Sequence, residues 1–290
     1  GQQGVMLLSG YGRSNVLSII TWNVNGIRAR QGDILQLIAQ ERPDVLCLQE
    51  IKASSEHIPA ELRDLADYYC YWHGHKGYSG VSLQITRSLS QPCPVFTHPS
   101  FDLETRIVSA DIGELRLVSV YVPNGGKDFP AKQEFLDALD AFAANALSEG
   151  KLLVVCGDLN VAREVRDVHP TLNNPQQIGQ TERERAQLER VIGNGLVDLS
   201  RQFQPDEDRL FTWWAPWRNM RQKNIGWRLD YVLCHRRLAE RALECRVLRD
   251  FGTSDHAPVL ARFDLDLPRY EFEPPPSPPS APGKPQLELF

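Results

Sequence analysis

The 290-residue sequence has no Cys-x-x-Cys motif, no Gly-x-Gly-x-x-Gly motif and no long apolar run. Its six cysteines are scattered, which argues against a zinc site or a disulfide framework and favours a reducing, cytoplasmic setting. Without the glycine motif, a Rossmann nucleotide-binding domain is not expected. No apolar run approaches the ~18 residues of a membrane span. The N-terminal stretch lacks the charged and long apolar regions of a signal peptide, so no membrane partner is expected.

Positive charge is not in excess either, since 32 Lys and Arg residues face 37 Asp and Glu residues and the formal net charge is -5. This balance argues against a protein that coats nucleic acid without specificity, but a nucleic-acid enzyme needs only a local basic patch. Hydrophobic residues make up 42% of the chain, which allows a globular protein with a sizeable core. No internal repeat is found at the periods of solenoid proteins.

Apolar and alternating segments predict strands, and apolar residues at helical spacing predict helices between them. Strands are expected at 17–23, 45–48, 80–85, 107–112, 115–121, 151–156, 228–233 and 259–265. Helices are expected at 131–147 and 184–192, and a shorter one is expected to be capped by Asp33 and ended by Pro43. Hairpins mixed with single helices indicate two packed sheets with helices outside. The last strand, with apolar residues at alternate positions, is expected to be half-buried.

Composition divides the chain into four parts. Residues 1–16 are rich in Gly, Ser and Gln and predict a loose extension, whereas 17–266 hold the dense pattern of strands and helices. Prolines crowd 267–285, which is typical of a stiff, polyproline-II-like linker. The final part, 286–290, is short and largely apolar.

Polar residues of a few kinds recur where the expected strands begin or end. The stretch 252–258 sets Asp255 beside His256 just before the last strand. The other such residues are Asn23, Asn25, Glu50, Asp158, Asn160 and Asp230. Carboxylates and amides with one histidine are hard, oxygen-rich ligands, which suit Mg²⁺ or Mn²⁺ better than structural zinc. Strand ends are polar in any protein, but the recurrence favours a metal-dependent site.

The stretch 211–228 interleaves tryptophan with basic residues and contains no acidic residue. Its members are Trp213, Trp214, Trp217, Trp227, Arg218, Arg221, Lys223 and Arg228. Aromatic faces stack on unstacked bases or sugars, while Arg and Lys bind phosphates. At least one of these tryptophans is expected in the core, but the pattern as a whole favours nucleic-acid binding.

Seven motifs in order between residues 19 and 263 resemble the exonuclease III family of apurinic/apyrimidinic (AP) endonucleases, in the deoxyribonuclease-I-like (endonuclease/exonuclease/phosphatase) superfamily. They lie at 21–29, 43–50, 77–81, 121–124, 157–162, 224–231 and 254–259. The resemblance implies an α+β fold, a four-layer αββα sandwich of two mainly antiparallel sheets with outer helices, in which 17–266 form the catalytic domain. Gln180 departs from the family, which commonly has an aromatic there. His73 and His75 are either additional contacts or simply exposed.

The same resemblance implies a Mg²⁺ site, in which Mn²⁺ can substitute, with Glu50, Asn25 and Asp255 as ligands. It also implies a group of residues around the scissile phosphate and the attacking water: Asp158, Asn160, His256, Asp230, Tyr121 and Asn23. In this group Asp158 orients or deprotonates the water, or the pair of His256 and Asp230 acts as the base. The sequence leaves these two alternatives open.

Further residues are expected to contact DNA. Trp213, Trp227 and Leu229 match the pocket that receives a flipped, base-less sugar, whose flipping costs little stacking. The expected contacts to the rest of the duplex are Lys76, Lys127, Arg218, Arg221, Asn224 and Arg228.

The implied activity is that of a Mg²⁺-dependent DNA repair phosphodiesterase, which cuts the backbone 5′ to abasic sites in duplex DNA and trims 3′ ends. An enzyme that is mainly a 3′→5′ exonuclease or 3′-phosphatase is the alternative, because loop shape decides that balance. A catalytically silent DNA- or clamp-binding module is the alternative from another class. The intact acidic residues and His256 argue against it.

The last five residues resemble the pentapeptide by which bacterial repair and replication proteins bind the β sliding clamp. The expected contacts are Gln286, Leu287, Leu289 and Phe290. A tether of about a dozen residues reaches ~35 Å at ~3.1 Å per residue. The expected setting is a monomer in the bacterial cytoplasm, associated with the nucleoid.

Overall fold

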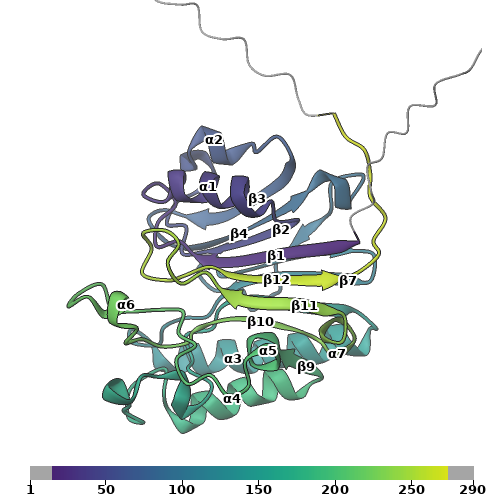
Figure 1. Ribbon diagram of the computed structural model, residues 1–290. Coiled ribbons are helices and arrows are strands. Elements are labelled where there is room, and N and C mark those ends of the chain that lie inside the picture. Colours follow the sequence, from purple (N-terminus) through teal and green to yellow (C-terminus); the bar gives the residue numbers. More distant parts are fainter. Residues whose placement is uncertain (1–14, 274–290) are drawn as a thin grey trace, which may run out of the picture.

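The computed structural model describes residues 15–273 as two six-stranded sheets stacked between layers of helix (Figure 1). The first sheet has the order β11 (Ala242–Val247), β12 (Val259–Asp264), β1 (Val16–Asn23), β2 (Val45–Gln49), β4 (Tyr78–Thr86) and β3 (Tyr68–His75). The second has the order β5 (Phe96–Thr97), β6 (Ile107–Ile112), β7 (Leu115–Tyr121), β8 (Leu152–Asp158), β10 (Asp230–His235) and β9 (Leu196–Asp198).

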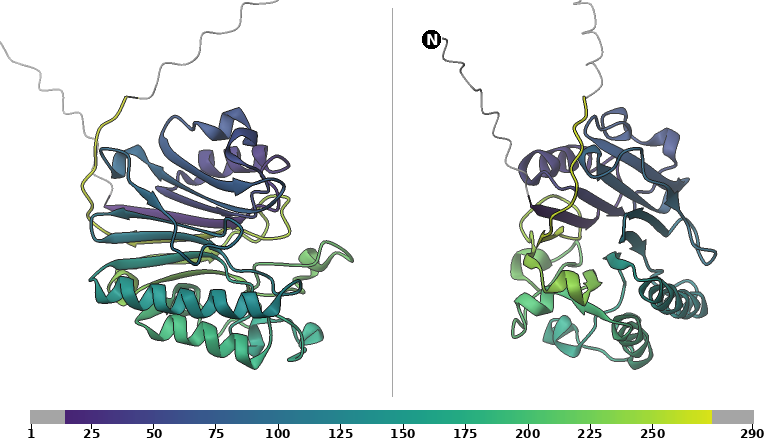
Figure 2. Two further views of the ribbon diagram at one scale, coloured as in Figure 1. Left: turned by 180° about the vertical axis from the view of Figure 1, so that it is seen from behind. Right: turned by 90° about the vertical axis from the view of Figure 1, so that its right-hand side faces the viewer.

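Only one pair of neighbours in each sheet is parallel among these described strands, β1 with β2 and β7 with β8. Helices α1 (Gln31–Glu41) and α2 (Ala60–Arg63) lie outside the first sheet, and α3 (Phe129–Ser148) and α4 (Glu182–Gly193) lie outside the second (Figure 2). Shorter helical segments are α5 (Leu199–Phe203), α6 (Met220–Lys223), α7 (Arg236–Ala239) and 3-10 turns at Ser55–His57, Arg87–Leu89, Val165–Asp167 and Pro170–Leu172. The expected αββα sandwich of mainly antiparallel sheets is confirmed.

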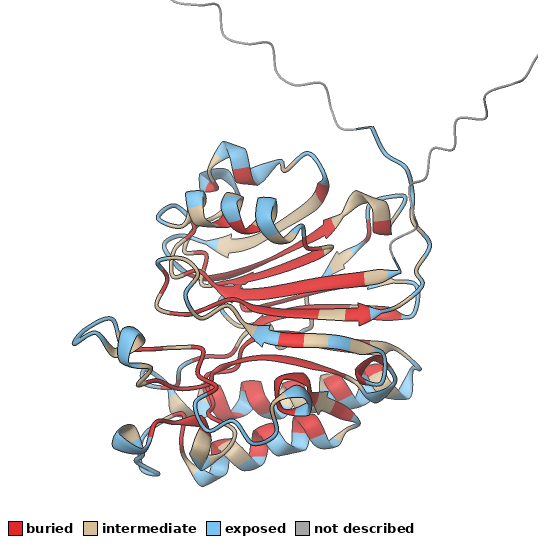
Figure 3. Ribbon diagram, in the orientation of Figure 1, coloured by how far each residue is buried: buried red, intermediate tan, exposed pale blue. Residues whose placement is uncertain are grey.

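Three apolar layers hold the sandwich together. The inner strands of both sheets are buried along most of their length, whereas β3 and β11 at the edges of the first sheet are mostly half-buried or exposed (Figure 3). Successive residues of a strand point to opposite faces, so in β7 Leu117 packs between the sheets whereas Val118 packs toward α3. Ile34 and Leu37 of α1 fill the third layer, against the first sheet. Both sheets are therefore anchored on both faces, which fixes the strand ends where the polar residues gather.

Two expectations about local structure were wrong. Asp33 does not cap α1, which begins at Gln31; its carboxylate accepts hydrogen bonds from the main-chain N and the hydroxyl of Thr253, at 3.0 and 2.8 Å. Strand β12 is not half-buried, because it lies between β11 and β1 and buries apolar residues on both faces, including Leu260 and Ala261. Strand β3 was not expected at all, since its sequence of aromatic, Cys, His and Gly residues shows no alternation.

The first residues of the proline-rich part contact the domain. Arg269 donates to a carboxylate oxygen of Asp44 at 2.7 Å and to the carbonyl oxygen of Val16 at 2.9 Å, and Tyr270 N donates to the carbonyl of Ser88 at 2.8 Å. The extension at 1–14 and the expected clamp-binding residues at 286–290 lie outside the described residues. Among residues 15–273, no helix combines the length and apolar character that a membrane crossing requires.

Candidate active site

Strand pairing aligns three of the expected residues in one row across the second sheet. The parallel register of β7 and β8 pairs Tyr121 with Asp158, and the antiparallel register of β8 and β10 pairs Asp158 with Asp230. In the first sheet, the ladder of β1 and β2 continues past the strand ends, since Val24 N donates to Gln49 O and Gly26 N to Glu50 O. These pairings bring residues from five separate motifs to one end of the sandwich.

Side-chain hydrogen bonds join the two sheets at this end. Asn23 Nδ2 donates to Asp158 Oδ2 at 2.9 Å, and the Tyr121 hydroxyl donates to Glu50 Oε1 at 3.2 Å. Burial first, and then the charges of Glu50 and Asp158, raise the pKa of Tyr121 well above its usual value. Tyr121 is therefore a neutral hydrogen-bond donor at physiological pH.

His256 lies between two buried carboxylates. Its Nδ1 is 2.8 Å from Asp230 Oδ2, and its Nε2 is 3.6 Å from Asp158 Oδ2. Burial alone would lower the pKa of His256, but the charges of Asp230 and Asp158 outweigh it and raise the pKa to about 10. Burial raises the pKa of Asp158 to about 7. The positive charge of His256 opposes this shift, and the negative charge of Asp230 adds to it. The imidazolium is thus the stable form of His256 beside these acids.

Asn160 is fixed next to Asp158 by its main chain and its side chain. Its N donates to Asp158 Oδ1 at 3.0 Å, and its Nδ2 donates to Val122 O at 2.7 Å. Asn160, Asn25 and Glu50 have φ values of 50°, 46° and 55°. Such left-handed conformations cost energy in residues other than glycine and concentrate at functional sites, which agrees with their place here.

Glu50, Asn25 and Asp255 offer two carboxylates and an amide oxygen, a donor set that fits Mg²⁺. The ammonium of Lys52 lies 2.8 Å from Asn25 Oδ1 and 4.0 Å from Glu50 Oε1, so these two oxygens already share a cation. Asp255 Oδ2 accepts from Trp213 Nε1 at 3.1 Å. The ligand atoms of Asp158, Asp230 and His256 also lie within 4.8 Å of one another, but the imidazolium form of His256 has no nitrogen lone pair to offer a metal ion.

The residues expected to form the abasic pocket are together beside His256. Trp227 and Leu229 are buried in one apolar cluster, against which Trp213 packs half-buried. The rings of Trp213 and Trp227 meet edge to face, with centroids 5.9 Å apart, and the Trp213 ring centroid is 6.4 Å from that of His256. These three side chains, here called the aromatic wall, therefore adjoin His256 and the carboxylates of Asp158 and Asp230 beside it.

Arg228 was expected to contact DNA, and this expectation was wrong. Its side chain is 0% exposed and donates to both carboxylate oxygens of Asp167 and of Asp198, at 2.8 to 3.1 Å. Arg221 was also expected to contact DNA, but its guanidinium donates to the main-chain carbonyl oxygens of Arg249, Phe251 and Ser254.

Asn224 caps α6 in a left-handed conformation and accepts a hydrogen bond from Trp214 Nε1 at 3.0 Å. Three other residues with an expected DNA contact are exposed: Lys76, Lys127 and Arg218. Because these three side chains are exposed, their charges can contact phosphates. Asn224 instead has a structural role in the loop that carries Arg218.

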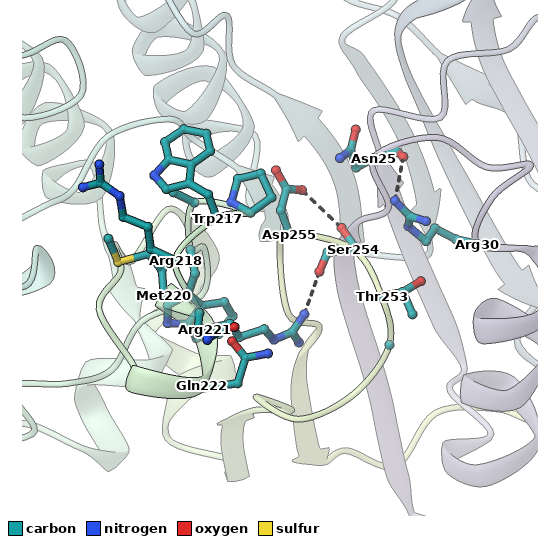
Figure 4. A pocket seen from close by; sticks show the side chains of 15 residues that line it. Asn25, Arg30, Trp217, Arg218, Met220, Arg221, Gln222, Thr253, Ser254 and Asp255 are labelled. Atoms are coloured by element: carbon teal, nitrogen blue, oxygen red, sulfur yellow. Dashed lines mark hydrogen bonds between the residues drawn. The ribbon is translucent and has the colours of Figure 1, made fainter.

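A cavity of about 400 Å³ opens next to the candidate metal ligands (Figure 4). Asn25 and Asp255 line one side, and Trp217 and Arg218 line the other. Trp217 is 60% exposed, so a large aromatic face is available at the mouth of the site. Arg30 also lines the cavity and donates to Asn25 O at 3.4 Å. The contacts of Arg30 and Lys52 with Asn25 were not predicted, because neither residue differs in sequence from an ordinary surface cation.

The departures noted in the sequence have structural explanations. Gln180 is buried, accepts from Asn174 N and donates to Leu172 O at 2.8 and 3.1 Å. His73 lies 2.6 Å from Asp102 through Nε2 and stacks on His98 with ring centroids 3.7 Å apart. This half-buried group links β3 to the loop before β6. His75 is exposed.

Residues 20–256 match the Endonuclease/Exonuclease/phosphatase family. The chain belongs to this family. Within it, the chain is 34% identical over 258 residues to Recombination repair protein 1 of Drosophila melanogaster, 86% of this chain and 37% of that longer protein. It is 31% identical over 250 residues to an exodeoxyribonuclease of Bacillus subtilis, 84% of this chain and 98% of the relative.

A solved structure of an AP endonuclease from Archaeoglobus fulgidus superimposes on this family member with a TM-score of 0.78. The two share 28% identity, over 86% of this chain and 100% of the other. The resemblance found in the sequence is confirmed by both kinds of similarity, at the level of family and fold.

Proposed function

We propose that the protein is a Mg²⁺-dependent DNA repair phosphodiesterase that cuts the backbone 5′ to abasic sites in duplex DNA. The observation that carries this proposal is the chain of buried contacts from Asn23 through Asp158 and His256 to Asp230, next to the oxygen donors of Glu50. A silent binding module has no need of three ionisable groups buried together, since such burial is costly.

Asp158 is the group proposed to orient the attacking water and accept its proton. Asn23 Nδ2 and the main-chain N of Asn160 hold its two oxygens, and a pKa raised by burial to about 7 suits a general base. His256 is protonated at that pH, because the carboxylates beside it raise its pKa to about 10. It therefore acts as a cationic donor to a phosphate oxygen, with Asp230 fixing its ring.

Glu50, Asn25 and Asp255 are the proposed metal ligands. A bound Mg²⁺ would supply positive charge to the phosphate as negative charge develops in the transition state. Lys52 holds Asn25 and faces Glu50, and it would shift when the ion binds.

Selectivity for an abasic site is proposed to come from the aromatic wall. Trp213, Trp227 and Leu229 would pack against a flipped sugar without a base, and Trp217 and Arg218 at the cavity would contact the duplex. The solved relative named an AP endonuclease supports this choice. We further propose that the protein works as a monomer on chromosomal DNA in the bacterial cytoplasm and nucleoid.

The second candidate is an enzyme that acts mainly on 3′ ends, as an exonuclease or phosphatase. The relative named an exodeoxyribonuclease favours it. Two duplexes decide between the candidates, one with a single internal abasic analogue and one with a nick that bears a 3′-phosphate, each incubated with Mg²⁺ and with EDTA. The first proposal expects faster incision at the abasic analogue. Faster attack at the nick, with the abasic duplex intact, would overturn it in favour of the second.

The C-terminal residues from Gln286 to Phe290 are proposed to bind a bacterial β sliding clamp. Their removal should abolish clamp binding and leave incision of free DNA unchanged. Unchanged affinity for the clamp after the deletion would refute this part.

A further inference from the structure

Lys132 lies near the start of α3, is 0% exposed and contacts loops at the candidate active site. Its ammonium donates to Asn124 O at 2.9 Å and to Asn160 O at 2.8 Å, and it pairs with the carboxylate of Glu184. An ammonium has three N–H donors, so each of them has an acceptor. Two of those acceptors are main-chain atoms in the loops that follow β7 and β8.

Glu184 extends this arrangement to a third loop. It lies in the first turn of α4 and is 0% exposed; its Oε1 accepts from Gly179 N at 2.8 Å and from the Thr181 hydroxyl at 2.7 Å. Gly179 has a φ of +93°, and a Cβ added there would lie 2.8 Å from Cζ3 of Trp227 and 3.3 Å from Asn160 O. The loop fixed by Glu184 is therefore in close contact with the aromatic wall.

Packing of α3 on α4 does not require this pair. Two buried ions lose hydration, and apolar side chains of similar volume often replace a buried ion pair without loss of stability. A separate ion pair also joins the two helices at the surface, where Arg190 Nη2 lies 3.2 Å from Asp137 Oδ1. What apolar side chains could not supply is a donor to the two main-chain oxygens and an acceptor for Gly179 N.

We propose that Lys132 and Glu184 are a positioning pair that sets the main chain of Asn160 on one side and the Gly179 turn against Trp227 on the other. Lys132 thereby aligns the Asp158–Asn160 segment with the scissile phosphate, and Glu184 sets the shape of the sugar pocket. The expected effect on catalysis rests on the proposed function, whereas the expected effect on the positions of the loops does not.

The test compares the double variant Lys132→Met/Glu184→Leu with the control Arg190→Met, which removes the surface pair between the same helices and keeps Asp137 as the acceptor of Gln187. Three readouts are needed: the thermal midpoint, amide hydrogen exchange at 158–162 and 177–181, and kcat and KM on the abasic duplex. The buried double variant should keep its midpoint within about 4 °C of wild type but lose exchange protection in both loops. A displacement of ~1 Å at a reacting group costs on the order of 10²-fold in kcat, and a loss of this size is expected. The control should retain wild-type protection and kcat.

Glu184→Gln provides a second, milder variant in case the double variant does not fold. The amide keeps an oxygen acceptor for Gly179 but loses the charge that holds the ammonium, so protection should fall at 158–162 more than at 177–181, and kcat should fall more than KM rises. Wild-type exchange in both loops in a folded variant would overturn the inference. If wild-type protein shows no abasic incision, the proposed function fails, and the exchange data still decide the inference.

Discussion

Replacing Arg228 by methionine tests whether this residue is a DNA contact, as its sequence context predicts, or a buried structural ion, as the fold indicates. The guanidinium is 0% exposed and makes four charge-assisted hydrogen bonds to Asp167 and Asp198. Without it, Arg201 still pairs with Asp167 and Arg163 still pairs with Asp198. Each carboxylate would keep one neutralising arginine but lose its two hydrogen bonds to Arg228.

Removing one partner of a buried ion pair typically costs about 3–5 kcal/mol. The two remaining arginines favour the lower end of this range, roughly 3 kcal/mol in the free energy of unfolding. At about 2–4 °C per kcal/mol for a domain of this size, the thermal midpoint should fall by roughly 6–12 °C. Urea denaturation at pH 7 measures the same loss at constant temperature.

Arg218→Met is the matched control, because Arg218 is exposed and lines the cavity next to the candidate metal ligands. It should leave the thermal midpoint unchanged and lower the salt dependence of DNA binding by about one phosphate contact. The same fluorescence titrations at several salt concentrations apply to Arg228→Met, whose salt dependence should match wild type. A stable Arg228→Met protein with a shallower salt dependence would refute the structural role.

Three further predictions follow from the site. In EDTA, the pKa of His256 is raised to about 10 by its carboxylate neighbours, so its contribution to stability is complete below pH ~6.5 and is lost as the pH rises toward 10. Urea titrations should show wild type losing more stability than His256→Asn between pH 7 and 10; parallel losses would contradict this coupling. His256→Asn should also lower kcat by on the order of 10²–10⁴, which single-turnover incision measures, and a near-wild-type rate would mean a structural role. Trp217→Ala should weaken binding of the abasic duplex roughly tenfold with no change in thermal midpoint, since the ring is 60% exposed; unchanged affinity would exclude a DNA contact.

Much of the fold and the acidic part of the site could be predicted from sequence, because the signals are local. Apolar runs marked the buried strands, and Asp158 and Asp255 stand in short motifs at strand ends. The row of Tyr121, Asp158 and Asp230 was implied only by resemblance, since it depends on the pairing of three strands whose register no local pattern encodes.

Burial of charge was the feature that sequence could not reveal. Arg228 follows a tryptophan in a basic stretch, which is what a phosphate-binding arginine looks like, but its partners Asp167 and Asp198 lie 61 and 30 residues away. Lys132 and Glu184 lie on different helices and outside every motif. Each becomes recognisable only when α3 and α4 are packed side by side.

Asp158 is proposed to activate the water that hydrolyses the backbone at an abasic site, and a metal ion held by Glu50, Asn25 and Asp255 would stabilise the charge that develops on the phosphate. The most direct measurement is the single-turnover rate of incision of a duplex with one abasic analogue, for wild type and Asp158→Asn, with Mg²⁺ and with EDTA. Wild type with Mg²⁺ should cut on the 5′ side of the analogue, EDTA should abolish the cut, and Asp158→Asn should slow it by on the order of 10²–10⁴. Incision that persists in EDTA, or that Asp158→Asn leaves unchanged, would contradict the proposed roles of the metal ion and Asp158.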